Sequence, residues 1–160
     1  MATRKPLVIV DGVLRQMAAG DILDAQLNEV DYVTVTNDEA GSVVIGAPVY
    51  VNGDGTVLKA IADAIGTSEV LGLVSDVSIA ASASGRVLTD GKLTATATQW
   101  DAVTGQTGGL TAGDIYFLDP TTAGKLTITA PTADTKVVAR VGKSLSATVL
   151  EISINQPILL

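Results

Sequence analysis

Two residue types with strong chemistry are missing from this 160-residue sequence, which has no cysteine and no histidine. Without cysteine the chain cannot form a disulfide framework, a thiolate nucleophile or an iron–sulfur site. Without histidine it lacks the commonest general base and the commonest zinc ligand. A chain of this length buries about 70% of its unfolded surface, so it needs neither a metal nor a disulfide to fold. The two absences argue against several large classes of enzyme.

Aromatic residues and long hydrophobic runs are also scarce. Aromatics make up 3% of the chain. A sugar-binding cleft is usually lined by aromatic side chains, so this chain has few residues with which to form one. The longest apolar runs, such as Leu7–Val10 and Ile115–Leu118, are far shorter than the roughly 20 residues of a membrane helix. The apolar stretch before Asp11 is too short for a signal peptide, so we expect a soluble product.

The charge balance is acidic. Asp and Glu number 17 against 10 Lys and Arg, which gives a net charge of −7 and a pI near 4.3. A phosphate backbone would be repelled, so the composition argues against nucleic acid as a partner. Hydrophobic residues nevertheless make up 47% of the chain, and its mean hydropathy is +0.42. We interpret this excess as apolar surface that is buried against further copies or another partner.

Valine and threonine are abundant, in short runs separated by Gly, Asn, Asp and Ser. Such runs are typical of β-strands joined by tight turns. Asp11-Gly12 between two apolar runs predicts a two-residue hairpin, because both turn positions need positive φ. In Leu150–Ile154 apolar and polar residues alternate, which gives a strand one buried face. The sequence therefore predicts an all-β sandwich or barrel. The expected strands are Leu7–Val10, Val13–Met17, Tyr32–Thr36, Val43–Ile45, Pro48–Val51, Val57–Ala60, Val70–Val74, Gly85–Thr89, Leu93–Ala97, Asp114–Leu118, Leu126–Ala130, Lys136–Val141 and Val149–Ile154.

One short helix is predicted around Trp100. Thr98, with Asp101 three residues later, resembles a capping box, and Gly105 is a typical helix stop. Trp100 and Val103 would share one face of this turn. We therefore expect the helix to close one end of the β-structure.

Two neighbouring aromatics point to opposite faces of one expected strand. We assign Phe117 to the core, whereas Tyr116 is left between core, interface and rim. Tyr50 has the same ambiguity.

A polar stretch, Asn37–Ser42, separates two parts of the chain that differ in their pattern of apolar runs and turns. We predict an N-terminal attachment arm with a hairpin over residues 1–36, a linker over 37–42 and a β-rich domain over 43–160.

We interpret the motifs that could support catalysis or ligand binding as turns and strand edges. Gly105–Gly109 lacks the spacing and the lysine of a phosphate-binding loop, and Asn52–Thr56 lacks the later ligands of a calcium loop. Lys143 and Ser144 are neighbours in a strand, so their side chains point to opposite faces and cannot form a local Ser–Lys pair. We predict a protein that is not an enzyme, with no catalytic residue, metal site or cofactor.

The N-terminal residues are one candidate partner-binding segment. Arg4 and Lys5 precede Pro6 and Leu7. Positive charge on an otherwise acidic protein indicates an arm that lies on an acidic partner surface.

The second candidate segment is the apolar tail formed by Ile158, Leu159 and Leu160. Burial against a neighbour would recover about 1.5–3 kcal/mol per side chain. Burial in the core of its own domain is the equal alternative.

Several stretches, taken in order, resemble small proteins of phage particles. They are Gly46–Val51, Gly55–Val57, Leu71–Val74, Ala81–Val87, Thr89–Gly91, Leu110–Leu118 and Gly124–Thr127. Their order is similar to that of the β-rich capsid decoration (cement) and head-fibre proteins of tailed bacteriophages. The opening Arg4–Val8, with Arg15-Gln16 and Ala19–Leu23, resembles the attachment segments of phage fibre and tail proteins.

This resemblance implies a structural virion protein with a β-tulip-like fold and an extended N-terminal arm. Such a protein would be made in the bacterial cytoplasm and would bind the major capsid protein on the outer capsid surface. It would form a homotrimer and would contact neither nucleic acid nor membrane. The alternative is a tail or fibre module that binds a host-surface glycan or protein through exposed aromatics such as Trp100 or Tyr116.

Overall fold

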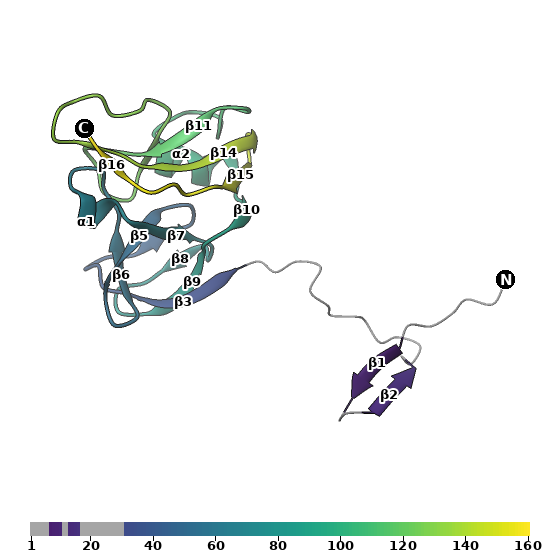
Figure 1. Ribbon diagram of the computed structural model, residues 1–160. Helices are drawn as coiled ribbons and strands as arrows, with labels where there is room; N and C mark the ends of the chain where they lie inside the picture. The colour runs from purple at the N-terminus through teal and green to yellow at the C-terminus, as the bar shows by residue number, and fades with distance from the viewer. Residues whose placement is uncertain (1–6, 11–12, 17–30) are drawn as a thin grey trace.

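The computed structural model describes residues 7–10, 13–16 and 31–160. These residues form mostly β-strands, with two short helices, α1 (Ile65–Ser68) and α2 (Ala97–Thr104) (Figure 1). The predicted all-β class is confirmed. The sequence predicts one helix, whereas the described residues contain two. The additional helix, α1, is a single turn whose N-cap residue Ala64 makes no side-chain capping bond, so it carries no cap pattern in the sequence.

Five strands close into a barrel in the order β3-β6-β5-β7-β9. Neighbours are antiparallel except β3 and β6, which are parallel where Thr36 pairs with Thr56. A closed barrel of this kind leaves no open sheet edge. Its strands are β3 (Tyr32–Asn37), β5 (Pro48–Gly53), β6 (Thr56–Lys59), β7 (Val70–Val74) and β9 (Ser84–Leu88).

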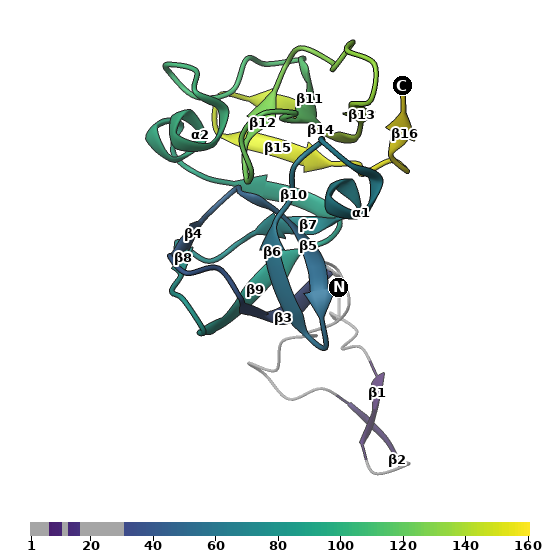
Figure 2. The same ribbon diagram turned by 90° about the vertical axis from the view of Figure 1, so that its left-hand side faces the viewer.

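A five-stranded antiparallel sheet lies on one side of the barrel, above it in Figures 1 and 2. Its order is β10-β15-β14-β11-β12. Register shifts after Tyr116 in β11 and after Ser144 in β14 mark local irregularities of the β-bulge kind, which bend and twist a strand. The strands are β10 (Gly91–Thr94), β11 (Ile115–Leu118), β12 (Leu126–Thr127), β14 (Arg140–Ser146) and β15 (Val149–Ile152).

The remaining strands of the described residues form three two-stranded sheets. β1 pairs with β2 from Leu7 opposite Gln16 to Val10 opposite Val13, so the strands flanking the predicted Asp11-Gly12 turn are confirmed. Arg4, Lys5 and Pro6 lie outside the described residues. The three pairs are β1 (Leu7–Val10) with β2 (Val13–Gln16), β4 (Val43–Val44) with β8 (Ser78–Ile79), and β13 (Val137–Val138) with β16 (Ile158–Leu159).

The predicted domain boundary is wrong at β3. The segment Tyr32–Thr36 was assigned to the arm, yet it pairs with β9 along its whole length. Asn37, assigned to the linker, is fully buried. Its Nδ2 donates to the carbonyls of Gly41 and Ile79, both at 2.9 Å. β3 is therefore a wall of the barrel, and the reason for the error is that its partner lies about fifty residues later in the chain.

Helix α2 begins two residues earlier than predicted. The capping box is formed by Thr96 and Gln99, because the Gln99 N–H donates to Thr96 Oγ1 and the Thr96 N–H donates to Gln99 Oε1. Asp101 instead accepts the Gly109 N–H at 2.6 Å and shapes the following loop. The predicted stop is confirmed, since Gly105 has a left-handed φ of 69°.

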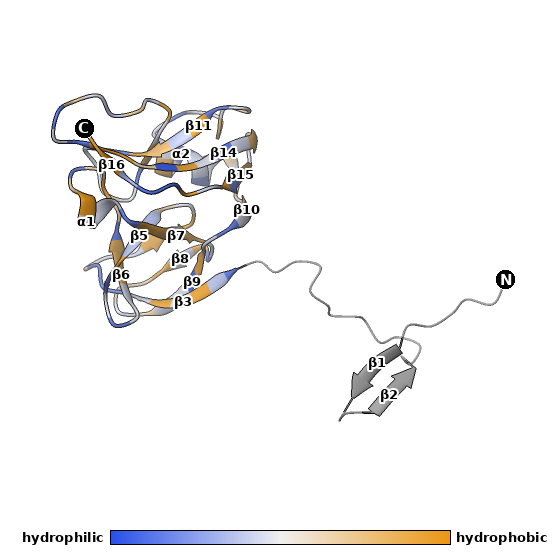
Figure 3. Ribbon diagram, in the orientation of Figure 1, coloured by the Kyte–Doolittle hydropathy of each residue, from blue (hydrophilic) through white to orange (hydrophobic). Residues whose placement is uncertain are grey.

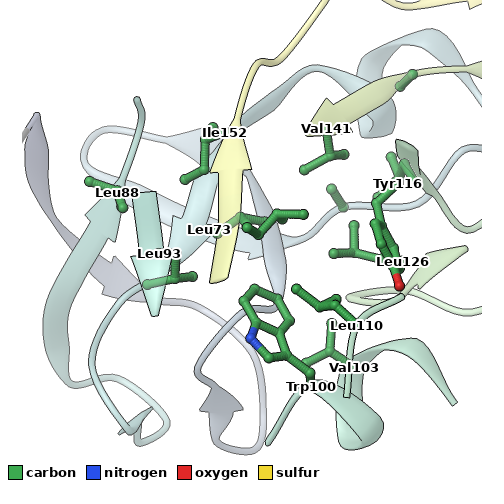
Figure 4. Close-up of a cluster of buried hydrophobic side chains, with 14 of the residues drawn as sticks. Leu73, Leu88, Leu93, Trp100, Val103, Leu110, Tyr116, Leu126, Val141 and Ile152 are labelled. Carbon is green, nitrogen blue, oxygen red and sulfur yellow. The ribbon is translucent and has the colours of Figure 1, made fainter. Parts of the chain in front are cut away.

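Two hydrophobic clusters hold the fold together. The barrel interior is filled by short side chains, because a five-stranded barrel has little internal space. The larger cluster lies between barrel, sheet and α2, and the fully buried Trp100 belongs to it, beside Val103 and Leu110 (Figure 4). Gly46 has a φ of 81°, and a Cβ there would lie 2.9 Å from the Trp100 ring. Trp100 and Val103 both lie on the buried face of α2, as the sequence predicts. The expected closure of one end of the β-structure by this helix stays a prediction.

Candidate interaction surface

The C-terminal tail is anchored in its own domain by its backbone. β16 pairs antiparallel with β13, and the Leu160 N–H donates to the Lys136 carbonyl at 3.0 Å. Residues in an antiparallel ladder alternate between bonded and non-bonded pairs. Leu159, opposite Val137 and adjacent to the bonded Leu160, therefore directs its backbone N–H and C=O away from β13, toward the open edge.

The side chains of this tail are exposed, not buried in the domain core. We call Ile158, Leu159 and Leu160 the C-terminal apolar edge, and Figure 3 colours this end of the chain as hydrophobic. Their exposed fractions are 64% for Ile158, 56% for Leu159 and 47% for Leu160. Three adjacent aliphatic side chains on an open strand edge form a typical surface for strand addition or apolar docking.

A second apolar surface lies between the β4–β8 pair and α2. Here Val77 is 73% exposed and Val44 is 41% exposed. They border a groove of about 370 Å³, whose lining residues are Val44, Ile45, Val77, Ser78, Thr98, Gln99 and Ala102.

The polar groove near β12 has a different chemistry. It has a volume of about 380 Å³ and is lined by threonine, proline and alanine, with Asp119 and Lys136 as its charged members. Both charged groups are already engaged. The Asp119 carboxylate accepts from the N–H groups of Thr121 and Thr122, and Lys136 Nζ donates to the Pro120 carbonyl at 3.1 Å. Hydrogen bonds within the domain therefore hold both charged side chains in place at this groove.

The aromatic side chains that the alternative function needs at the surface lie in the core. Trp100 is fully buried, and its Nε1 donates to the Thr148 carbonyl at 3.1 Å. Tyr116 is also fully buried, and its hydroxyl donates to Gln106 Oε1 at 2.6 Å. The assignment of Phe117 to the core is wrong, because Tyr116 faces inward and Phe117 is half-buried on the other face.

One ion pair is present among residues 31–160, between Arg86 and Asp76 at 2.9 Å. Arg86 Nε also donates to Asp76 at 3.0 Å, and the Arg86 backbone N–H donates to the second carboxylate oxygen at 2.8 Å. The guanidinium lies 5.3 Å from the centroid of the Tyr32 ring, within the range of a cation–π contact. This cluster links β3, β9 and the β7–β8 turn. No local sequence pattern predicts it, because its members are distant in the chain.

The Asp76 cluster predicts a pH dependence of stability. The hydrogen bond from the Arg86 backbone N–H, with the Arg86 side chain, lowers the pKa of Asp76 below its usual value, despite a partial offset from burial. A lowered folded-state pKa contributes stability that is present above the unfolded pKa and is lost as pH falls through the folded pKa. We expect Asp76→Asn to unfold at lower temperature than the wild type at pH 7 and to lose less stability between about pH 5 and pH 2. Thermal melts across that range measure the difference. Parallel curves for the two proteins would contradict it.

Within the part of the chain that the structure describes, no group of three or more metal-ligating side chains comes together. Neither described helix has the length and apolar character to cross a bilayer. No protein-family model matches this chain, and a search of curated proteins finds no match. The likeness to phage decoration proteins therefore stays a prediction from the sequence.

Proposed function

We propose that this protein decorates and stabilises the capsid of a tailed bacteriophage through non-covalent adhesion to the major capsid protein. The observation that carries the proposal is the C-terminal apolar edge, where the side chains of Ile158 and Leu159 in β16 and of the following Leu160 are exposed, and β16 is held in place by β13. The ordered resemblance of the sequence to decoration and head-fibre proteins supports the choice of partner and the outer capsid surface as the location.

The energetics of such an edge suit a repetitive shell. Burying one of these side chains is worth about 1.5–3 kcal/mol before the cost of association. That gain is modest for one contact. A shell presents the same site many times, and a ligand that binds only the assembled form shifts the equilibrium toward it. Weak adhesion by each copy thus adds up to a stabilised particle.

The scaffold keeps the cost of binding low. Val137 of β13 is fully buried in the larger hydrophobic cluster, and β16 pairs with β13. The edge is thus anchored before binding, so less conformational entropy is lost on docking. In this proposal the N-terminal residues Arg4, Lys5, Pro6 and Leu7 form a second attachment point, and the protein acts as a homotrimer.

The proposal predicts that a charge in the apolar edge weakens adhesion. Leu159→Asp places a carboxylate where the edge would be buried, so we expect its Kd for undecorated capsids to rise at least tenfold, which corresponds to about 1.4 kcal/mol. Ile128→Asp is the matched control, because Ile128 is also an exposed aliphatic and lies outside both apolar surfaces. This variant should bind like the wild type. Co-sedimentation with capsids measures both. Equal occupancy by the two variants, or no binding by the wild type, would contradict the proposal.

A further inference from the structure

The outer face of the five-stranded sheet carries an unusual charge for an acidic protein. Its strands contain four charged residues, and three of them are the cations Lys92, Arg140 and Lys143, against the single carboxylate of Glu151. The chain as a whole has a net charge of −7. These strands therefore hold more cations than acids, the reverse of the balance in the chain as a whole.

The register of the sheet places these residues in a row. Lys92 lies opposite Glu151, Glu151 lies opposite Lys143, and Lys143 lies opposite Ile115. The first three are exposed, as is Ile115 at 38%. Directly opposite residues in antiparallel strands share one face, so this row faces solvent.

Arg140 belongs to the same face. It lies opposite Phe117, whose chain neighbours Tyr116 and Leu118 are both fully buried. Leu145 adds a second aliphatic side chain at 45% exposure. We call Lys92, Lys143, Ile115 and Leu145, with Glu151 between the two lysines and the half-buried Arg140 beside them, the basic sheet face. The Nε of Arg140 is buried and has no hydrogen-bond partner. Among the described residues the ion-pair distance is met only by Arg86 and Asp76, so none of the three cations is paired.

A surface of opposite character lies on the barrel, around the β5–β6 hairpin. Asp38 and Asp54 are exposed, and Asn52 Nδ2 donates to Asp38 Oδ2 at 2.9 Å, which joins the two loops. Glu39 is not part of this surface, because its carboxylate accepts the N–H of Lys59 at the opposite end of β6, at 2.8 Å. The side chain of Lys59 lies against Gly124, so its charge is directed away from these carboxylates.

This barrel surface also has an apolar member. Val51, in β5, is 55% exposed next to Asn52. We call Asp38, Asp54 and Val51 the acidic barrel end. The hairpin that carries Asp54 lies at the end of the barrel away from the five-stranded sheet (Figure 2). The two surfaces thus combine opposite charge with aliphatic side chains, and they lie in different halves of the molecule.

We infer that the basic sheet face of one copy docks on the acidic barrel end of a second copy. The contact is heterologous, because each copy contributes a different surface, so repetition closes a ring or continues as a filament. Charge complementarity fixes the register of the contact, and the exposed aliphatics supply apolar burial. The inference concerns contacts between copies only, so it stands or falls separately from adhesion to a capsid.

Charge reversal on the full-length chain tests the inference. Sedimentation velocity is expected to show the wild type above monomer mass. The dissociation constant should rise as salt shortens the Debye length from ~10 Å at 0.1 M to ~3 Å at 1 M. Lys92→Glu with Lys143→Glu should weaken association at least tenfold, and so should Asp38→Lys with Asp54→Lys. Lys125→Glu with Lys136→Glu makes the same change in net charge outside the basic sheet face and should associate like the wild type.

The chain carrying all four reversals restores complementarity with the signs exchanged, and we expect it to regain association. This rescue cannot come from a loss of folding, and thermal melts confirm that each variant is folded. A wild type that is monomeric at every concentration would overturn the inference. So would unchanged association of the Lys92/Lys143 variant, or a folded fourfold variant that stays dissociated. None of these outcomes depends on capsid binding.

Discussion

Replacing Trp100 by alanine is expected to lower the free energy of unfolding by about 3–5 kcal/mol, in the range of large aromatic deletions from a core. Trp100 is fully buried and belongs to the cluster that joins barrel, sheet and α2. Gly46 leaves room for the indole ring, because a Cβ at this position would lie 2.9 Å from it. The cavity left by alanine would therefore be lined by elements from both halves of the domain, which cannot close on it independently.

Denaturant unfolding followed by circular dichroism measures this loss, since the variant lacks the only tryptophan. Trp100→Phe is the matched control. It keeps an aromatic ring but removes the hydrogen bond to the Thr148 carbonyl, so we expect a smaller loss than for alanine. A loss below about 1 kcal/mol for Trp100→Ala would mean that the two halves do not depend on this side chain.

The second large effect is expected at Asn37. Its Nδ2 donates to the carbonyls of Gly41, Ile79 and Ala80, and its Oδ1 accepts the Glu39 N–H at 2.9 Å. Asn37→Asp replaces the donor by a charged acceptor facing buried carbonyl oxygens. Such a group is neither solvated nor paired, so we expect a loss of about 3 kcal/mol or more at pH 7.

The loss should be smaller at acidic pH. Burial beside carbonyls raises the folded-state pKa of the introduced carboxyl, so its contribution to stability recovers as pH falls and the group becomes protonated. Asn155→Asp, at an exposed site, is the control and should change stability by less than about 0.5 kcal/mol. Urea unfolding at pH 7 and pH 4.5 measures both variants. Equal losses at positions 37 and 155 would contradict the buried role of Asn37.

Local patterns in the sequence predict the features that depend on neighbouring residues. The strands on either side of Asp11-Gly12, the stop at Gly105 and the alternation of Leu150–Ile152 all follow from nearby residues and are present in the structure. The start of α2 was misplaced because Thr96 with Gln99 and Thr98 with Asp101 have the same spacing. Only the observed hydrogen bonds separate the two.

Features that depend on distant partners could not be read from the sequence. β3 was assigned to the arm because nothing local shows that β9 and β6 pair with it. In β11 all four residues are apolar, so alternation cannot tell that Tyr116 faces inward and Phe117 outward. The sheet's position relative to α2 decides that choice.

The same distinction between neighbouring residues and distant partners applies to the candidate surfaces. The C-terminal apolar edge is visible in the sequence as an aliphatic run, although its exposure is known only once β16 is seen beside β13. The basic sheet face has no sequence signature, because Lys92 is separated from Lys143 and Glu151 by some fifty residues. Strand register brings them into one row.

The account rests on adhesion to a repeated shell, and the most direct measurement is the composition of purified virions. Quantitative mass spectrometry gives the ratio of this protein to the major capsid protein. We predict a fixed ratio that does not change between preparations, with the protein lost together with capsid stability when Leu159 is replaced by Asp. Absence of the protein from the particles, or a count limited to the few copies of a tail component, would contradict the account.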